Sequence, residues 1–380
     1  MRVLTVYYKH RPGGMMQMIY RMLRGGAERG WSMHYVSVAR FEIAHPRIVR
    51  HRLPWPGRHD SLAFWAWFFL IAPIVSAWVA RRERVDLYAV FEGSYAWVMR
   101  LAQRVWPRPM VVFLQSDVAT INRLHRRPAV VRRLEQMMEC AGLRAAHRII
   151  ATNRTLADIV TARWALPTAK IQVVPNTVRL PPLSRPKARA ALRAEHGVPT
   201  DAFVIATSGV FSPRKNLAVL LAAFAELDAA RAHLVVIGES PDAKEWQRAT
   251  QAARAGRNGE RVHFLGWRND VPCVLAGCDL FVFPSRHEGS PLSLIEALRV
   301  GVPCLGSDIP EIREVLGACA DLFFPPDRVD VLRVRLQRAL DDRDFYQRLC
   351  TLTDNRVAHY DFDWEVRVTE ILRTTAATAR

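Results

Sequence analysis

Short apolar runs alternate with helical patterns along the whole chain, and this alternation is the feature that most restricts its fold. Strands separated by helices of about ten residues or more indicate βαβ units, whose parallel sheet is covered by helices on both faces. The predicted strands fall into two sets. The first is Val3–Tyr8, Met33–Val38, Asp86–Phe91, Val111–Leu114, Arg148–Thr152 and Ile171–Val174, and the second is Phe203–Ser208, Leu234–Gly238, Val262–Gly266, Leu280–Pro284 and Pro303–Gly306.

The segment 181–187 (PPLSRPK) separates the two sets, and we interpret it as a hinge, although an ordinary surface loop would have the same composition. Two strand sets predict an α/β protein with two Rossmann-like domains, at 1–180 and 181–355, followed by a tail at 356–380. Ligands of open parallel sheets bind beyond the carboxyl ends of the strands. Two such domains facing each other predict a cleft, with one ligand held by each domain.

The net charge of +18 is unevenly distributed. Residues 1–180 hold 28 Lys and Arg against 10 Asp and Glu, and 8 of the 11 Trp, whereas residues 181–380 hold 26 of each charge sign. A basic, tryptophan-rich half predicts an anionic partner such as nucleic acid, acidic lipid or an acidic substrate.

The six cysteines show no C-x-x-C pair and no histidine cluster at metal-ligand spacing. This pattern argues against structural zinc and a disulfide framework, and favours a reducing cytosol. The chain opens directly on a predicted strand, so we expect no signal peptide.

Residues 61–80 contain no charged side chain, and Arg81 and Arg82 follow them. The length suits a membrane span. However, predicted strands of one sheet lie on both sides of the segment, and a span would separate them across a bilayer. We therefore favour a helix that is buried or inserted into the membrane surface over a true span.

Gly13 and Gly14 lie in the predicted turn between the first strand and its helix. Glycines there allow a ligand to approach the backbone and the helix N-terminus, although a tight turn would use them equally well. The G-x-G-x-x-G and P-loop patterns are absent from this turn.

A second turn, at residues 208–216 (SGVFSPRKN), follows the predicted strand Phe203–Ser208. Ser212 and Pro213 resemble a helix start, which places Arg214 and Lys215 beside exposed backbone N–H groups. Two cations at this position suit a diphosphate, and the alternative is a solvated pair on a loop.

The third and strongest motif is residues 284–297 (PSRHEGSPLSLIEA), after the strand Leu280–Pro284. We expect Ser290 to cap a helix whose first residue is Pro291, with Glu288 on the loop and Glu296 in the second turn. Carboxylates accept hydrogen bonds from the vicinal hydroxyls of a ribose or hexose. The N–H groups of residues 289–292 suit a phosphate, whereas Glu296 alone could be an exposed helix residue.

Together these motifs resemble the retaining nucleotide-sugar glycosyltransferases of GT-B fold, family 4, over residues 1–375. The resemblance also includes residues 175–178 (PNTV), 264–267 (FLGW), the E-x7-E spacing of Glu288 and Glu296, and the Gly301-Val302-Pro303 that follows. It implies a GT-B fold of two facing Rossmann-like domains, whose tail crosses back onto the first domain near Trp364.

The resemblance also implies residue roles. Arg214 and Lys215 would neutralise the departing diphosphate, Glu296 would hold the ribose, and Glu288 would lie beside the donor hexose. The remaining donor-site residues would be Gly13, Gly14, Gly209, Trp267, Arg268, Gly289, Ser290, Pro291, Leu292 and Ser293, with the base held largely by main chain at residues 266–269.

The sequence departs from the family pattern in two places. Val210 replaces an arginine that many relatives have after the glycine of the phosphate loop, and Arg214 would compensate. Residues 114–117 (LQSD) lack a histidine common in relatives, so Glu92, Asp117 and Arg123 become the acceptor-side candidates. Asp361-Phe362-Asp363 resembles a metal-binding motif, but we interpret it as a helix start and expect no metal or other cofactor.

The resemblance implies hexosyl transfer from a nucleotide diphosphate sugar with retention at the anomeric carbon. The basic first half predicts a lipid-linked or membrane-embedded acceptor, for an enzyme peripheral to the cytoplasmic face of the membrane and active in envelope polysaccharide, lipopolysaccharide or glycolipid synthesis. A soluble acceptor is the alternative. A nucleic-acid-binding protein is a remote one, because no helix-turn-helix or RNA-binding signature is present, and we expect no nucleic-acid partner.

Overall fold

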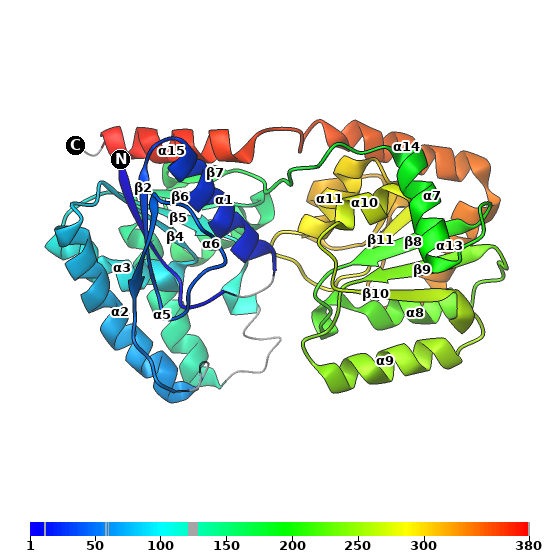
Figure 1. Ribbon diagram of the computed structural model, residues 1–380, viewed down its shortest axis with the longest axis horizontal. Helices are drawn as coiled ribbons and strands as arrows, with labels where there is room; N and C mark the ends of the chain where they lie inside the picture. Colours follow the sequence, from blue (N-terminus) through cyan, green and yellow to red (C-terminus); the bar gives the residue numbers. More distant parts are fainter. Residues whose placement is uncertain (11–12, 58, 60, 121–127, 379–380) are drawn as a thin grey trace. The chain divides into compact units, whose positions relative to one another are not determined.

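The computed structural model describes residues 1–10, 13–57, 59, 61–120 and 128–378, and it divides into two compact units (Figure 1). The first unit consists of Met1–Asn176 together with Asp363–Arg380, and the second of Thr177–Phe362. The chain therefore passes between the units twice. The domain limits predicted from the sequence lay after residues 180 and 355.

The first unit is a seven-stranded parallel sheet with the strand order β3-β2-β1-β4-β5-β6-β7. The order reverses direction between β1 and β4, as in doubly wound folds. Its elements are β1 (Arg2–Val6), α1 (Gly14–Glu28), β2 (Ser32–Ser37), β3 (Ile48–Arg52), α2 (Leu62–Arg82), β4 (Leu87–Phe91), α3 (Gly93–Val105), β5 (Met110–Leu114), α5 (Ala129–Ala145), β6 (Arg148–Ala151), α6 (Arg154–Trp164), η1 (Thr168–Lys170), β7 (Ile171–Val173) and α15 (Trp364–Thr378).

Helices cover both faces of this sheet (Figure 1). Helices α2, α3 and α5 pack side by side on one face, and α1 and α15 pack together on the other. Strands β4 and β5 are buried along their whole length, which explains their unbroken apolar sequences, LYAVF and MVVFL.

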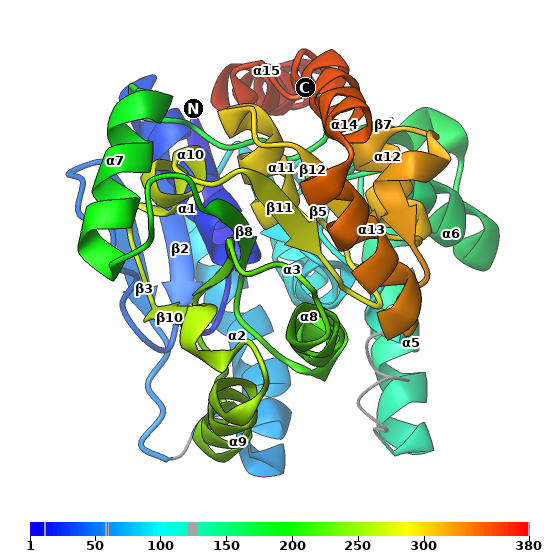
Figure 2. The same ribbon diagram turned by 90° about the vertical axis from the view of Figure 1, so that its right-hand side faces the viewer.

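The second unit is a six-stranded parallel sheet in the order β10-β9-β8-β11-β12-β13, again with helices on both faces (Figure 2). Its switch in strand order lies between β8 and β11. The elements are α7 (Arg185–His196), β8 (Phe203–Ser208), η2 (Pro213–Lys215), α8 (Leu217–Ala225), β9 (Ala232–Ile237), α9 (Ala243–Ala255), η3 (Gly259–Arg261), β10 (Val262–Gly266), α10 (Val271–Ala276), β11 (Leu280–Phe283), α11 (Leu292–Val300), β12 (Cys304–Ser307), α12 (Pro310–Leu316), η4 (Ala320–Leu322), β13 (Phe323–Phe324), α13 (Val329–Asp341) and α14 (Arg343–Val357).

Two parallel α/β sheets of this kind confirm the predicted Rossmann-like architecture. The sequence analysis missed two strands, β3 and β13, and both lie at a sheet edge. Strand β3 reads IVRHR and is only partly buried, so it lacks the apolar run that marks a central strand. Strand β13 has only two residues.

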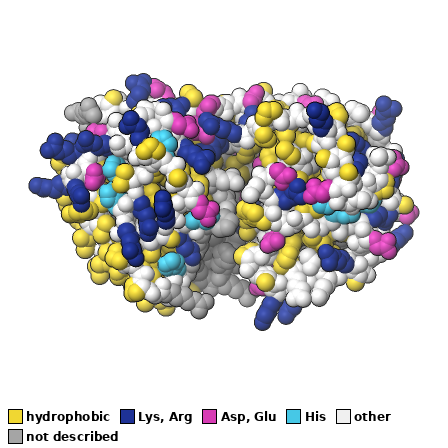
Figure 3. Space-filling view, viewed as in Figure 1, with side chains coloured by type: hydrophobic (Ala, Val, Ile, Leu, Met, Phe, Trp, Pro, Cys, Tyr) yellow, Lys and Arg dark blue, Asp and Glu magenta, His cyan; other side chains and the backbone are white. Residues whose placement is uncertain are grey.

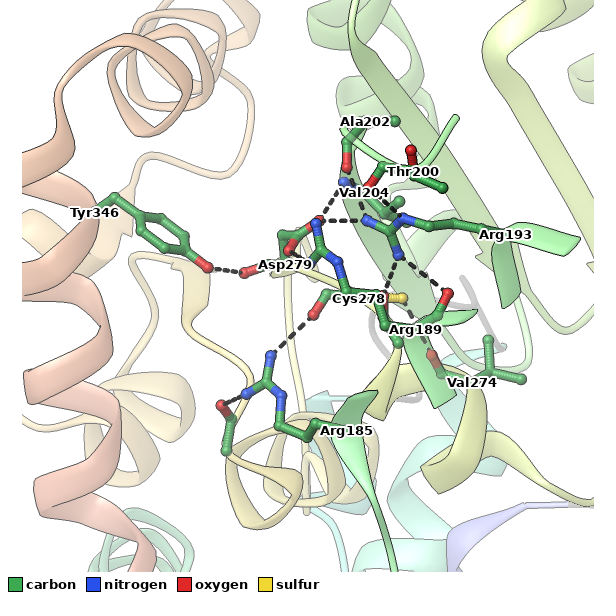
Figure 4. Close-up of polar contacts among 12 residues, drawn as sticks. Arg185, Arg189, Arg193, Thr200, Ala202, Val204, Val274, Cys278, Asp279 and Tyr346 are labelled. Atoms are coloured by element: carbon green, nitrogen blue, oxygen red, sulfur yellow. Dashed lines mark hydrogen bonds and ion pairs between the residues drawn. The ribbon is translucent and has the colours of Figure 1, made fainter. Parts of the chain in front are cut away.

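A charged cluster fastens α7 to the amino ends of β8 and β11 in the second unit (Figure 4). The Asp279 carboxylate accepts hydrogen bonds from Arg189, from Arg193 Nη2 at 3.2 Å and from the Val204 backbone N–H at 2.8 Å. Arg193 is 4% exposed and also donates to the carbonyls of Gly277 and Ala202. The cluster lies at the amino ends of the strands, whereas ligands of such sheets bind beyond the carboxyl ends. Its role is therefore to stabilise the fold.

Helix α2 contains the uncharged segment singled out from the sequence, and in the described part of the chain it is the one helix long and apolar enough to cross a membrane. The inner side of α2 is buried, with Phe64, Phe68, Ala72 and Ala80 fully enclosed. The helix packs on β1, β2 and α3. Leaving the sheet to span a bilayer would expose this inner side.

The last helix, α15, packs on α1 in the first unit. Arg21 of α1 donates two hydrogen bonds, each of 2.7 Å, to the carboxylate of Glu365, and Trp364 is 1% exposed. Gly25 of α1 lies against Glu365, where a Cβ atom would come within 3.1 Å of it. The tail is therefore an integral layer of the first unit.

Candidate functional site

The predicted cations and the loop glutamate meet at the strand-order switch of the second unit. Arg214 and Lys215 lie in η2, directly after β8, and Glu288 lies on the loop after β11, the strand paired with β8. Arg214 Nη1 lies 2.9 Å from Glu288 Oε2, and Lys215 Nζ lies 2.8 Å from Glu288 Oε1. Parallel sheets bind ligands at this position. The sequence named all three residues but did not predict that they form ion pairs with one another.

The surroundings keep Glu288 ionised although its side chain is only 3% exposed. Burial alone would raise the pKa of the Glu288 carboxyl, but Lys215, Arg214 and the Ser285 hydroxyl outweigh burial and hold that pKa below its usual value. Burial lowers the pKa of Lys215, against the opposing effect of Glu288. The site thus combines one buried carboxylate with two cations and carries a net positive charge.

The two cations differ in accessibility. Lys215 is nearly enclosed, and its ammonium lies 4.6 Å from the centre of the Phe283 ring. The Arg214 side chain is 32% exposed and uses Nη1 for Glu288 and for the carbonyl of His287, at 2.7 Å. A guanidinium has five N–H donors. Arg214 is therefore the cation better placed to meet an incoming anion.

Two glycines allow the backbone just after β8 and the backbone just after β9 to approach each other closely. Gly209 has φ +155 and Gly238 has φ +113. A Cβ atom on Gly238 would lie 2.0 Å from the Gly209 carbonyl oxygen, so the position after β9 requires glycine. A Cβ on Gly209 would face the Lys215 side chain at 3.7 Å. The turn at residues 208–216 therefore depends on the absence of a side chain at Gly238, a residue that the sequence analysis did not single out.

The predicted start of helix α11 is wrong by one residue. The helix begins at Leu292 with Pro291 at its N-cap position and no side-chain cap, whereas the sequence predicted Ser290 as the cap and Pro291 as the first helical residue. Pro291 has ψ 64, outside the helical range. Gly289 and Ser290 remain on the loop, and Ser293 lies half-buried in the first helical turn.

Glu296 lies in the second turn of α11, as predicted, and is half-buried, so the alternative of an exposed helix residue is wrong. Burial raises the pKa of the Glu296 carboxyl to about 7. Burial raises this pKa because it removes water from the carboxylate. Hydrogen bonds from the hydroxyls of a ligand would replace that water and stabilise the ionised form.

Trp267 and Arg268 follow β10, beyond its last residue Gly266. Trp267 is 54% exposed. Arg268 is held by Asp270, through two hydrogen bonds of 2.8 Å, and by Glu195 at 2.6 Å. These hydrogen bonds raise the pKa of Arg268. Its side chain is thus committed to neighbouring acids, which leaves the main chain of residues 266–269 for the predicted contact with a base.

In the first unit, the loops after β1 and β4 carry the candidates. Gly13 is the N-cap of α1 with φ +137, and a Cβ atom added to it would meet open space, with none of the described residues beyond its chain neighbours within 4 Å. Gly14 is the first residue of α1. Glu92 has φ +68 and precedes α3. These residues flank the strand-order switch of the first sheet, β1 beside β4.

Two buried glutamates lie together behind this switch. Glu92 accepts hydrogen bonds from the Ser116 hydroxyl at 3.1 Å and the Gln115 N–H at 3.3 Å. Burial, and then the neighbouring Glu139, raise the pKa of Glu92 to about 8, and burial raises the pKa of Glu139 to about 7. The sequence named Glu92 but missed Glu139, which lies in α5 and has no motif around it.

The other two acceptor-side candidates are less informative. The Asp117 carboxylate is bound by Arg163, with one contact of 3.0 Å, by the Thr120 hydroxyl and by the Ala119 N–H. Although burial opposes it, Arg163 lowers the pKa of Asp117. Contact with an acceptor therefore stays a prediction for Asp117. Arg123 lies outside the described residues.

No cluster of three or more His, Cys, Asp or Glu side chains that could hold a metal is found among the residues the structure describes. The acids of the motif Asp361-Phe362-Asp363 are engaged separately. Asp361 pairs with Arg299, and Asp363 accepts from the Val366 N–H at 2.9 Å near the start of α15. Their contacts are those of a helix start and a surface ion pair.

Comparison with known families decides what kind of protein carries this arrangement. Residues 188–351 match the family described as glycosyl transferases group 1, and residues 13–177 match the glycosyl transferase 4-like domain. The chain belongs to the group 1 glycosyl transferases. Its fold is the two-domain, Rossmann-like GT-B fold of these enzymes.

Individual relatives of this glycosyltransferase are distant. The 2-deoxystreptamine N-acetyl-D-glucosaminyltransferase of Streptomyces fradiae is 27% identical over 357 residues, covering 87% of this chain and 82% of that enzyme. The UDP-Gal:alpha-D-GlcNAc-diphosphoundecaprenol alpha-1,3-galactosyltransferase of Escherichia coli is 25% identical over 60% of this chain and 59% of its own. The structure of Anabaena Alr3699/HepE with UDP and glucose superposes with a TM-score of 0.76 over 100% of both chains, at 17% identity.

Proposed function

We propose that this glycosyltransferase moves a hexosyl unit from a uridine or guanosine diphosphate sugar to a lipid-linked acceptor, with retention at the anomeric carbon and without a metal ion. The observation that carries the proposal is the cluster of Arg214, Lys215 and Glu288 at the strand-order switch of the second unit. A diphosphate needs cations, and a sugar needs a fixed acceptor of hydroxyl hydrogen bonds.

The cluster suits stabilisation of the leaving group. As the bond to the sugar breaks, negative charge develops on the departing diphosphate, and cations fixed beforehand stabilise that charge without rearranging. Arg214 would contact the diphosphate with its exposed N–H donors. Lys215, buried against Glu288, would hold the carboxylate in place and add positive potential from behind. Glu288 would accept from hydroxyls of the donor hexose.

Retention follows from the family resemblance, in which the acceptor attacks the face that the leaving group departs from. A phosphate oxygen of the donor would then take the acceptor proton, and no nucleophile from the protein is required. Gly13 and Gly14, at the N-terminus of α1, would offer backbone N–H groups to a phosphate or to the acceptor.

Glu296 provides a test of donor binding through its pH dependence. Only the ionised carboxylate can accept hydrogen bonds from both ribose hydroxyls with its two oxygens. In the enzyme without a ligand, the pKa of Glu296 is about 7. Affinity for the donor should therefore be full above pH 8 and fall on going below pH 7 towards a limit about tenfold lower, which is the affinity of the protonated form. Calorimetric titration with nucleotide diphosphate sugars, whose diphosphate does not titrate in this range, measures the profile.

The Glu296→Gln variant should bind the preferred donor about tenfold more weakly at pH 8 and lose the decline below pH 7. Glu226→Gln is the matched control, because Glu226 forms an ion pair with Arg333 on the surface of the same unit. A wild-type profile that stays flat from pH 8 to pH 5.5 would remove Glu296 from the donor site.

The proposed acceptor is an envelope glycan precursor or glycolipid at the cytoplasmic face of the membrane, where the enzyme would act as a peripheral protein. The positive charge confined to residues 1–180 supports this proposal, since anionic lipid attracts basic surfaces. The E. coli relative names a diphosphoundecaprenol acceptor. A non-lipid acceptor is the second candidate, because the S. fradiae relative names 2-deoxystreptamine.

A donor screen followed by an acceptor screen tests these proposals in order. Uridine and guanosine diphosphate sugars are first ranked by thermal shift, and release of nucleoside diphosphate from the preferred donor is then measured with lipid extracts and with water-soluble sugars. Stimulation by the lipid fraction alone supports a lipid-linked acceptor. Stimulation by water-soluble sugars alone would favour the second candidate, and no thermal shift with any nucleotide sugar would contradict the donor assignment.

A further inference from the structure

Helix α2 presents a continuous apolar row to the outside of the first unit. Its members, spaced four residues apart, are Leu62, Ala66, Leu70, Ile74 and Trp78. Successive residues at this spacing are neighbours on the surface of a helix, and the row turns by about 40° per step around the outer half of α2. Leu62, Leu70, Ile74 and Trp78 are 81%, 65%, 52% and 53% exposed. In Figure 3 hydrophobic side chains gather at the lower left, over α2. We call these five residues the outer row.

A basic hollow adjoins the C-terminal end of the outer row. It has a volume of about 470 Å³, and its lining includes Arg2, Arg47, Arg82 and Arg84, with Glu83 as the one acid among its described lining residues. We call it the arginine hollow. The two features are in contact, because the Arg82 guanidinium lies over the Trp78 ring, 4.8 Å from its centre.

We propose that the outer row of α2 inserts into the interfacial region of an anionic bilayer while the arginine hollow binds the phosphates of its lipids. The proposal rests on the membrane location in the proposed function and adds the surface through which the enzyme would be held there. It assigns the helix a position in the plane of the membrane, with one side in lipid and the other on the sheet.

The arrangement of charge and apolar surface favours a bilayer as the occupant. Large apolar side chains in a continuous row are costly to leave in water, and such patches mark interaction surfaces. Tryptophan and arginine together at one end of the row match the interfacial belt, where the ring meets the headgroups and the cation meets phosphate. An anionic bilayer offers both environments at a single surface, whereas a protein partner would need an apolar groove ending in acidic residues.

Binding of the full chain to lipid vesicles tests the proposal. The wild-type protein should bind vesicles of phosphatidylglycerol and phosphatidylcholine at low salt, and bind pure phosphatidylcholine far more weakly. Leu70→Gln with Ile74→Gln should reduce binding to the anionic vesicles at least about tenfold. Arg47→Gln with Arg84→Gln should reduce it about 30-fold, at about 1 kcal/mol per cation. Lipids brominated near the headgroup should quench wild-type fluorescence more than that of Trp78→Phe.

Val334→Gln is the control, since Val334 is an apolar residue of α13 that is 52% exposed and lies in the second unit. All variants alter exposed side chains, so thermal midpoints and donor affinity should match those of the wild type. If the outer-row variants bind the vesicles as tightly as the wild type does, the inference is overturned but the membrane location in the proposed function is not. No binding of the wild type to any vesicle would overturn both the inference and the membrane location, while intact donor affinity would leave the donor assignment standing. A dimer in solution that Leu70→Gln with Ile74→Gln abolishes would instead assign the row to a contact between copies of the chain.

Discussion

Arg214→Ala is expected to lower turnover of the preferred donor by about 100-fold or more while the fold stays intact. Arg214 is partly exposed, and Lys215 remains to balance the Glu288 carboxylate after the guanidinium is lost. Stability should therefore change little, whereas the charge that develops on the diphosphate loses its most accessible cation. Release of nucleoside diphosphate measures the effect without knowledge of the acceptor.

Two further variants make this result specific. Arg214→Lys keeps the charge but loses the forked donor geometry, so it should recover only part of the activity. Arg328→Ala, which removes an exposed ion pair with Asp330 elsewhere in the same unit, should leave turnover unchanged. Near-normal turnover in Arg214→Ala would exclude this residue from leaving-group stabilisation.

Lys215→Ala should give a less specific loss. Because Lys215 is buried against Glu288, removing it strands a carboxylate, and a broken buried pair costs about 3–5 kcal/mol. Loss of activity would then be mixed with loss of the native loop. Arg214 is the residue on which the chemistry can be tested cleanly.

A large effect on stability is also expected for Asp279→Asn. The neutral amide would leave Arg193, 4% exposed, without its counter-charge, and removing one partner from a buried ion pair costs about 3–5 kcal/mol. For a unit of this size such a loss lowers the thermal midpoint by on the order of 10 °C. Differential scanning calorimetry should show the shift in the transition of the second unit.

Asp330→Asn is the matched control for that experiment. Asp330 also pairs with an arginine, Arg328, but both side chains are more than half exposed. An exposed ion pair contributes little, so the midpoint should stay near the wild-type value. Equal midpoints for Asp279→Asn and Asp330→Asn would mean that water reaches Arg193 and that the cluster does not fasten α7 to the sheet.

The sequence predicted the central strands of both sheets and missed one edge strand of each, the partly buried β3 and the two-residue β13. β8 and β11 read as apolar runs because both of their faces are covered, and the turns after them were therefore correctly located. Strand β3 has only two apolar residues, Ile48 and Val49, before Arg50, His51 and Arg52 at the partly exposed sheet edge, so its composition carries no such signal.

The candidate site was predictable in its residue types but not in its internal contacts. Charge and turn chemistry identified Arg214, Lys215 and Glu288 as ligand-binding side chains. Their mutual ion pairs depend on β8 lying beside β11, and this pairing of strands distant in sequence is fixed by the whole sheet. Glu139 was missed for the same reason, since only the packing of α5 on α3 makes its carboxyl buried.

The return of α15 to the first unit has a consequence for biosynthesis. The first 176 residues leave the ribosome long before Trp364 and Glu365, which complete the packing on α1. Until residues 364 and 365 have been synthesised, the nascent first unit lacks the Glu365 carboxylate that binds Arg21, and the surface under Trp364 is open to water. A chain truncated after residue 362 would keep its first unit in this incomplete state, and it would become a substrate for chaperones and proteases.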